Sequence, residues 1–244
     1  MSYTTNLPAT TIDTAIPWYW EPFDFFQDAS LEARDAFFRA SIKLKYAKGD
    51  YIVMANDTGR RIFFLEDGIV KIFNLSSNGT QTIFWFCVQG DVFGAGAISG
   101  SDYQSVYAQA VEPSTVHFIT RTDFEDIMKR YPQIAINMIR MLGARLRLAC
   151  DSMVDISERK AESRLARVLL RLAHNYGMRA GDRVAIRVQV SHQELADMIG
   201  SSRQTVNTLL HEFSKNGWID LKGRTFSILS KADLQEITEI GGSS

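Results

Sequence analysis

The residues with the clearest chemical potential are four polar side chains near position 205. Arg203, Gln204, Asn207 and Thr208 have the spacing that places side chains on one face of a helix. A guanidinium matches guanine O6 and N7, and an amide matches adenine N6 and N7. A row of this kind near the start of a helix can therefore discriminate base pairs in the major groove of DNA.

A second helix must hold this row in place, and the preceding residues predict one. Ser191 and Glu194 have the spacing of a capping box, in which each side chain satisfies a free backbone N–H at a helix start. Gly200 then permits a sharp turn, and Ser202 can cap the helix that carries the polar row. The sequence thus predicts a helix-turn-helix whose apolar residues face inward, namely Leu195, Met198, Ile199, Val206, Leu209, Leu210 and Phe213.

Other polar residues around this unit suit the phosphate backbone. Gln193, Ser202 and Thr205, with the backbone N–H groups at the two helix starts, can donate to phosphate oxygens. Residues 218–228 alternate around Lys222-Gly223-Arg224, which predicts a β-hairpin with a basic tip. A winged module would lay that tip on the DNA backbone.

Charge is distributed unevenly along the chain. Residues 156–244 contain 13 lysines and arginines against 10 aspartates and glutamates, whereas residues 1–155 contain 14 against 18. The net charge of -1 argues against indiscriminate coating of nucleic acid, yet a basic face on the C-terminal half can meet phosphates.

Composition is that of an ordinary soluble globular protein with one large or two modest domains, since 45% of the 244 residues are hydrophobic and 23% are charged. Cys87 and Cys150 are too few for a disulfide framework or a four-ligand metal site, so we expect a reducing compartment and no metal. No run of about 18 apolar residues and no export signal is found, which indicates a cytoplasmic protein.

The N-terminal half has the pattern of an antiparallel β domain. Residues 43–120 form short β-rich segments separated by turn residues at intervals of roughly 8 to 12, with Asn78-Gly79 as the sharpest hairpin signal. A short helix is expected after Ser30. The first 20 or so residues, with Trp18 and Trp20, form either a flexible arm or an aromatic strap.

A long helix is expected from Pro132 to about Met153. Seven apolar residues along it and just beyond repeat at steps of four and three, which is a coiled-coil period: Ala135, Ile139, Leu142, Leu146, Ala149, Met153 and Ile156. A second strip, Ile134, Met138, Met141 and Leu148, can serve the β domain. We favour a homodimer across the seven-residue seam; the alternative is a helix that packs only on its own β domain.

Beyond this helix, residues 161–176 read as another helix, residues 179–182 as a loop and residues 184–190 as a strand. The order of β domain, long helix and winged helix-turn-helix resembles the Crp/Fnr family of bacterial transcription regulators, from about residue 25 to 235. Residues 193–219, QELADMIGSSRQTVNTLLHEFSKNGWI, are similar to the DNA-binding signature of that family.

The resemblance implies an α+β fold: an N-terminal antiparallel, jelly-roll-like β-roll with its arm (1–131), a dimerisation helix (132–157) and a winged helix-turn-helix domain (158–244). Arg203 matches the family arginine that contacts guanine, but Gln204 and Thr208 stand where the cyclic-AMP receptor branch has Glu and Arg. We therefore expect a different palindromic operator. The family's backbone contacts fall on His192, Gln193, Ser202, Thr205, Lys222 and Arg224.

The β-roll resembles the family's cyclic-nucleotide-binding domain, but its ligand-binding residues differ. Ala95 replaces the Glu that meets the ribose, and Gln104 replaces the Arg that meets the cyclic phosphate. Ala149 and Cys150 replace two hydroxyl residues that meet the purine. The resemblance thus argues against cyclic AMP, and the scattered cysteines and histidines argue against an iron–sulfur cluster or haem.

The altered pocket suits a small apolar or aromatic effector. Its expected lining is Phe84, Trp85, Phe93, Ala95, Gln104, Ser105, Tyr107, Leu146, Ala149 and Cys150. The alternatives are a small-molecule-binding module, a regulator with no ligand, and redox sensing through Cys87 or Cys150. No catalytic motif is present, so no enzyme is expected. The segment near 179–187 lies where family members touch RNA polymerase, which makes polymerase a possible partner.

Overall fold

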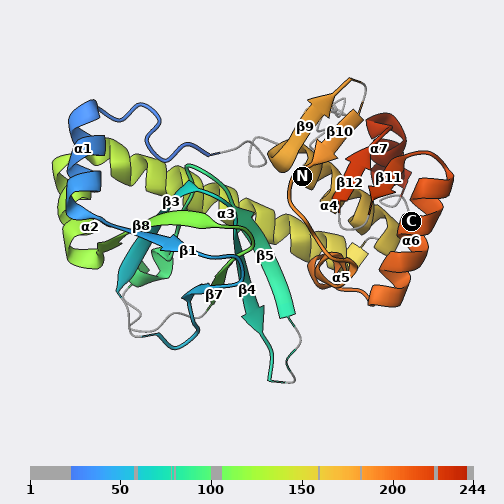
Figure 1. The fold of residues 1–244 in the computed structure, drawn as a ribbon, viewed down its shortest axis with the longest axis horizontal. Helices are drawn as coiled ribbons and strands as arrows, with labels where there is room; N and C mark the ends of the chain where they lie inside the picture. Colours follow the sequence, from blue (N-terminus) through green and yellow to red (C-terminus); the bar gives the residue numbers. More distant parts are fainter. Residues whose placement is uncertain are drawn as a thin grey trace, which may run out of the picture.

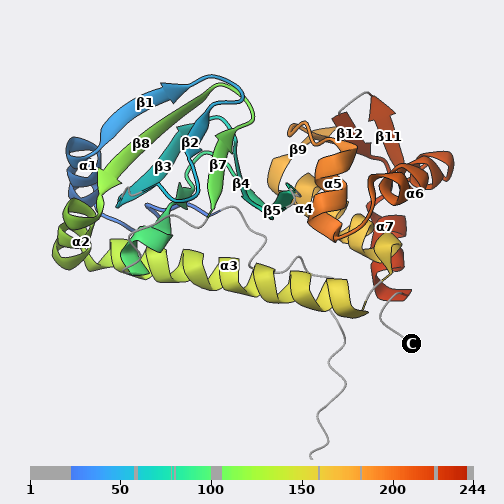
Figure 2. The ribbon, with the colours of Figure 1, turned by 90° about the horizontal axis from the view of Figure 1, so that it is seen from below.

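The computed structural model describes residues 23–57, 60–77, 79, 81–99, 106–158, 160–181, 183–222 and 225–240. Two lobes are joined by one long helix (Figures 1 and 2). The predicted fold class, an antiparallel β-roll followed by a long helix and a winged helix-turn-helix, is confirmed. The predictions made for the N-terminal arm and for Asn78, Gln104, Ser105, Gly223 and Arg224 lie outside the described residues.

The N-terminal lobe begins with helix α1 (Leu31–Ala40), where Ser30 Oγ accepts a hydrogen bond of 3.2 Å from the Ala33 backbone N–H. Two four-stranded antiparallel sheets follow, in the orders β1-β8-β3-β6 and β2-β7-β4-β5. The strands are β1 (Ile42–Tyr46), β2 (Tyr51–Val53), β3 (Arg61–Asp67), β4 (Val70–Leu75), β5 (Gln81–Cys87), β6 (Val92–Phe93), β7 (Tyr107–Ala110) and β8 (Ser114–Thr120), with a 3-10 helix η2 (Ala95–Ser99) after β6. Each β-rich segment of the sequence thus supplies one strand.

The turn between β3 and β4 depends on a glycine. Gly68 has a φ of +97°, and a Cβ at this position would lie 2.4 Å from Ser114 Oγ. Only glycine can adopt that backbone conformation and fit into so little space. This turn keeps β3 in one sheet and β4 in the other.

Helix α2 (Arg121–Arg130) leads into α3 (Pro132–Glu158), which runs along the N-terminal lobe and reaches the C-terminal lobe (Figure 2). Ile134, Met138 and Met141 are buried in a core that also contains Phe37 and Phe124. Three residues of the predicted second strip therefore pack on the N-terminal lobe, whereas the fourth, Leu148, is half-buried and lies outside this core. The seam lies on the other side, where Ile139, Leu142, Leu146, Met153 and Ile156 are exposed in the single chain.

The C-terminal lobe contains α4 (Ala161–Tyr176), β9 (Gly177–Ala180), β10 (Arg183–Ile186), α5 (His192–Ile199), α6 (Arg203–Lys215), β11 (Ile219–Lys222), β12 (Thr225–Ile228) and α7 (Lys231–Ile240). Its sheet has the order β11-β12-β10-β9. The loop expected at 179–182 is shorter, because Arg179 pairs with Val184 and Ala180 with Arg183 in an antiparallel hairpin. The strand expected at 184–190 ends at Ile186.

The two lobes share one apolar core. Phe73 and Phe86 of the β-roll belong to the same buried cluster as Leu169 and Leu195 of the C-terminal lobe. Strand β5 lies against α5 at this junction. Among the described helices, none is long and apolar enough to cross a membrane.

Candidate nucleic-acid interface

Helix α5 begins with the predicted capping box. Ser191 Oγ accepts a hydrogen bond of 3.2 Å from the Glu194 backbone N–H, and Glu194 Oε2 accepts one of 2.9 Å from the Ser191 backbone N–H. The helix ends at Gly200, whose φ of 59° is left-handed and turns the chain into α6. The capping box and the turn therefore fix the angle at which α6 leaves α5.

Helix α6 presents the predicted polar row to solvent. Ser202 Oγ caps its start by accepting a hydrogen bond of 3.0 Å from the Thr205 backbone N–H. Val206, Leu210 and Phe213 are buried beneath the helix. On the opposite face the side chains of Arg203, Gln204, Asn207 and Thr208 are all exposed. The geometry thus leaves this row available to a partner; its contact with bases stays a prediction.

The residues predicted to contact phosphates surround this row. His192 Nδ1 hydrogen-bonds to Asn207 Oδ1, which joins the start of α5 to α6. The Ser202 and Thr205 hydroxyls lie 2.8 Å apart, and Gln193 Nε2 donates to Asp197 Oδ1 at 2.8 Å. Lys222 ends β11 with an exposed side chain, and its Nζ lies 3.7 Å from Asp220 Oδ2.

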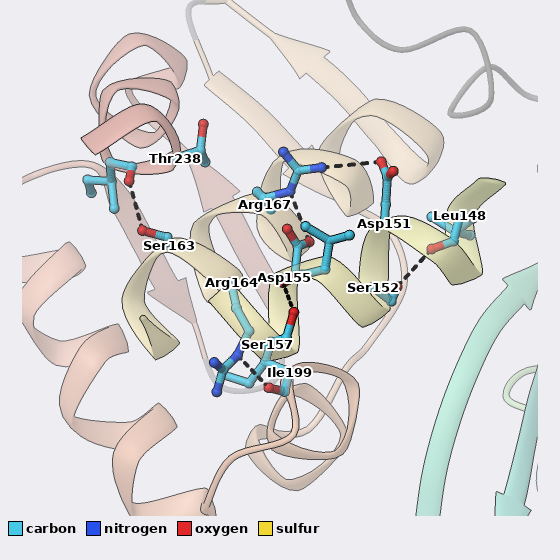
Figure 3. Close-up of polar contacts among 12 residues, drawn as sticks. Leu148, Asp151, Ser152, Asp155, Ser157, Ser163, Arg164, Arg167, Ile199 and Thr238 are labelled. Carbon is cyan, nitrogen blue, oxygen red and sulfur yellow. Dashed lines mark hydrogen bonds and ion pairs between the residues drawn. The ribbon is translucent and has the colours of Figure 1, made fainter. Parts of the chain in front are cut away.

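Helix α4 holds the helix-turn-helix against the end of α3 (Figure 3). Arg167 lies 3.0 Å from Asp155 Oδ2 through Nε and 3.5 Å from Asp151 Oδ2 through Nη2. Three residues earlier, Arg164 Nε donates a hydrogen bond of 2.8 Å to the carbonyl oxygen of Ile199, at the end of α5. Helix α4 therefore connects the end of α3 to the end of α5 through two adjacent arginines.

A second connection runs from the β-roll to the capping box. Lys71 Nζ on β4 lies 2.8 Å from Glu194 Oε1, and both side chains are largely buried. Lys71 Nζ also lies 5.1 Å from the centre of the Phe73 ring. Burial alone would raise the pKa of Glu194, but hydrogen bonds from Lys71 and from the Ser191 backbone lower it below its ordinary value. Glu194 is thus a carboxylate at neutral pH.

The structure disperses the described residues of the expected effector pocket. Phe93 is buried and stacks on Phe63 at 5.1 Å, and Tyr107 stacks on Phe73 at 5.3 Å. Ala95 begins η2 at the edge of the core around α1, and Phe84 is on the surface of β5. On α3, the side chains of Leu146, Ala149 and Cys150 are exposed. The opposite face of this helix, which includes Met141 and Leu148, is the one that packs on the rest of the chain.

Of this set, Trp85 lines a cavity that the sequence did not predict. The cavity has a volume of about 70 Å³ and lies between the two lobes, where β5, α3, α4 and α5 meet. Its wall includes Trp85, Asp91, Arg145, Arg171, Asn175 and Tyr176, and is called here the interdomain cavity. The sequence does not indicate that these residues lie together. Arg145 and Asp91, for example, are 54 residues apart in the chain, and the fold brings Arg145 Nη2 to 3.2 Å from Asp91 Oδ1.

Comparison with known proteins agrees with this arrangement. Residues 43–131 match the cyclic nucleotide-binding domain, and residues 163–237 match the Crp-like helix-turn-helix domain. The fumarate and nitrate reduction regulatory protein of Vibrio cholerae is 26% identical over 193 residues, which cover 79% of this chain and 77% of the relative.

Solved structures show the same fold. FixK2 from Bradyrhizobium japonicum has a TM-score of 0.71 at 22% identity, with 81% of this chain and 96% of that chain covered. TTHA1359 from Thermus thermophilus, a transcriptional regulator of the CRP/FNR family, has a TM-score of 0.68 at 20% identity, with 82% and 100% covered. With both domains matched in order and the helix-turn-helix exposed, the chain belongs to the Crp/Fnr family of DNA-binding transcription regulators.

Proposed function

We propose that two copies of this regulator form a homodimer that reads a palindromic operator under the control of a small effector other than cyclic AMP. The observation that carries the proposal is that the same chain presents both an exposed polar row on α6 and an exposed apolar seam on α3. The polar row has side chains that can recognise base edges in DNA. The apolar seam can be buried by a second helix that packs against it.

The seam supports a second copy of the chain as its partner. Helix α3 has 27 residues and is about 40 Å long, and its seam repeats at the coiled-coil period along most of that length. Ile139, Leu146 and Met153 are 70%, 66% and 71% exposed in the single chain. A stripe of this size is unfavourable in water, and a straight seam is complementary to itself across a two-fold axis.

In such a dimer the two α6 helices enter successive major grooves, about 34 Å apart. Arg203 contacts guanine, Gln204 and Asn207 contact adenine, and Thr208 adds a hydroxyl to the same face. The phosphate contacts come from residues around the row and on the wing: His192, Gln193, Ser202, Thr205, Lys222 and Arg224.

Two features support an effector other than a cyclic nucleotide. By the family resemblance, Ala95 at the start of η2 stands where nucleotide binders have a Glu for the ribose hydroxyl, and the stacked pair of Phe63 and Phe93 fills the adjoining core. An effector in this lobe is therefore proposed to be small and apolar or aromatic. It would act by shifting the lobes between two arrangements, one of which sets the α6 helices in register with the operator.

The experiment is selection of a duplex from a random pool, followed by fluorescence anisotropy with the selected and a scrambled duplex. Arg203→Ala should weaken binding to the selected duplex by about 1 to 3 kcal/mol and leave the scrambled duplex almost unaffected. Arg39→Ala, at an exposed arginine on α1, is the matched control and should change neither. Equal affinity of the wild-type protein for both duplexes at 150 mM salt would contradict the proposal.

A further inference from the structure

We infer that the interdomain cavity is a second ligand site, which takes a small oxyanion held by Arg171. This site differs from the effector pocket expected inside the β-roll, and of the residues expected in that pocket Trp85 alone lines it. The inference rests on the geometry of the cavity. It draws on the proposed function only where DNA binding is a readout.

The size of the cavity limits the ligand. Its volume is about 70 Å³, and one water molecule needs roughly 10 to 15 Å³ of the same measure. The space therefore accommodates about five non-hydrogen atoms, which is the size of a carboxylate such as acetate, of sulfate or of phosphate. A nucleotide or an aromatic ring system is too large.

Charge in the wall selects an anion. Arg171 on α4 lines the cavity and forms no ion pair or hydrogen bond with any residue of the described part of the chain. Burial lowers the pKa of this guanidinium, since desolvation disfavours the charged form. An arginine nevertheless stays protonated, and Asp155 and Asp151 only partly offset the cost of half-burying this charge.

The neighbouring carboxylates contact other arginines. Arg145 lies 3.2 Å from Asp91. Arg167 and Arg147 share Asp151, and Arg167 also pairs with Asp155. Each of these three carboxylates thus has an arginine other than Arg171 within ion-pair distance.

The wall also carries two buried polar atoms that have no hydrogen-bond partner. Trp85 Nε1 is a donor and can reach an oxyanion, whereas Asn175 Oδ1 is an acceptor and cannot donate to one. The Tyr176 hydroxyl donates to the carbonyl oxygen of Phe86 at 2.9 Å, which ties α4 to β5 and fixes the width of the cavity. An oxyanion can accept two parallel hydrogen bonds from a guanidinium and leave an oxygen for a donor across the cavity.

A ligand here would contact both lobes. Trp85 belongs to the β-roll, whereas Arg171 and Asn175 belong to α4 of the C-terminal lobe. Binding would consequently favour the arrangement of the lobes in which these three side chains converge. The oxyanion would then change operator affinity by the same factor by which the operator changes oxyanion affinity.

The test is calorimetric titration of the purified full-length protein with sodium acetate, sodium sulfate and sodium phosphate, each against sodium chloride at the same ionic strength. Trp85 fluorescence is recorded in parallel, with Trp85→Phe to assign the signal. We expect at least one oxyanion to bind once per subunit and to change the fluorescence of the wild-type protein. Which salts bind separates carboxylate from phosphate-like ligands.

Arg171→Gln should weaken that binding at least tenfold, whereas Arg39→Gln should leave it unchanged. No binding beyond that of chloride, or equal binding by Arg171→Gln, would overturn the inference. Should Arg171→Gln fail to fold by circular dichroism, Trp85→Phe in the calorimetric titration provides the second variant, with a loss of affinity again expected because it removes the buried donor. Binding of the selected DNA duplex by Arg171→Gln is measured as well. The variant should still bind this duplex, because loss of the oxyanion site leaves the polar row on α6 intact. Failure of the oxyanion inference can thus be told apart from failure of the proposed function.

Discussion

Lys71 and Glu194 form an ion pair of 2.8 Å that joins the centre of the β-roll to the first turn of the helix-turn-helix, 123 residues later. Glu194 also accepts the backbone N–H of Ser191 in the capping box. One carboxylate therefore serves two roles, since it closes the start of α5 and anchors the C-terminal lobe to β4.

The first prediction concerns the strength of this pair. Lys71→Met should destabilise the protein by about 2 to 3 kcal/mol, because it leaves a largely buried carboxylate without its cation. A double-mutant cycle with Glu194→Gln, followed by chemical denaturation, should give a coupling energy above about 1 kcal/mol.

The exposed pair of Lys129 and Asp126 is the matched control. Their side chains are 73% and 67% exposed and lie 3.0 Å apart on α2. The same cycle here should give a coupling below about 0.5 kcal/mol, since solvent screens the charges. Equal coupling in the two cycles would show that burial does not strengthen the interdomain pair.

The second prediction concerns pH. Although burial opposes it, the hydrogen bonds from Lys71 and Ser191 hold the pKa of Glu194 below 4.5 in the folded protein. The stabilisation by the charged Glu194 is thus fully present above about pH 4.5 and is lost as the pH falls through the lower, folded-state pKa. Glu194→Gln keeps a capping side chain but no charge. The difference in unfolding free energy between wild type and Glu194→Gln, measured from pH 6 to pH 3, should shrink on acidification; a constant difference would contradict this assignment.

The third prediction concerns the seam on α3. Wild type should sediment as the proposed dimer and Leu146→Asp as a monomer, because a charge would then lie at the centre of the apolar interface. The far-ultraviolet circular dichroism should stay the same, since Leu146 is on the surface of the single chain. Leu31→Asp, at an exposed leucine on α1, is the control and should leave the mass unchanged. A Leu146→Asp variant that stays dimeric would contradict the proposal that the seam is the dimer interface.

The fourth prediction concerns thiol chemistry. Burial raises the pKa of Cys87 from 9.0 to about 12, and its sulfur lies in the core of the β-roll. In a Cys150→Ser background, iodoacetamide should therefore leave the native protein unlabelled at pH 8 and should label it once after denaturation. Rapid labelling of the native protein would restore Cys87 as a candidate redox sensor.

Much of the fold follows from local patterns in the sequence. Turn residues such as Gly49, Gly68 and Gly90 separate strands of the β-roll, and the capping box at Ser191 marks the start of α5 to the residue. The hairpin of β9 and β10 was only half predicted, because Arg179 and Ala180 carry no β pattern of their own and form a strand through their pairing with β10.

The candidate DNA-binding row was also accessible from the sequence, since helix periodicity alone places its four residues on one face. The interdomain cavity was not. Arg171 sits in a helix rich in alternating charged and apolar residues, where an unpaired arginine looks like any solvated one. Only the packing of β5 against α4 and α5 reveals that this arginine lines a cavity between the lobes.

The apolar cluster shared by Phe73, Phe86, Leu169 and Leu195 also limits how this regulator can switch. Separating the lobes completely would wet all four side chains, at a cost of several kcal/mol by the usual transfer free energies. A weakly bound metabolite cannot supply that much. A signal that keeps this cluster buried would have to move one lobe along the other without separating them.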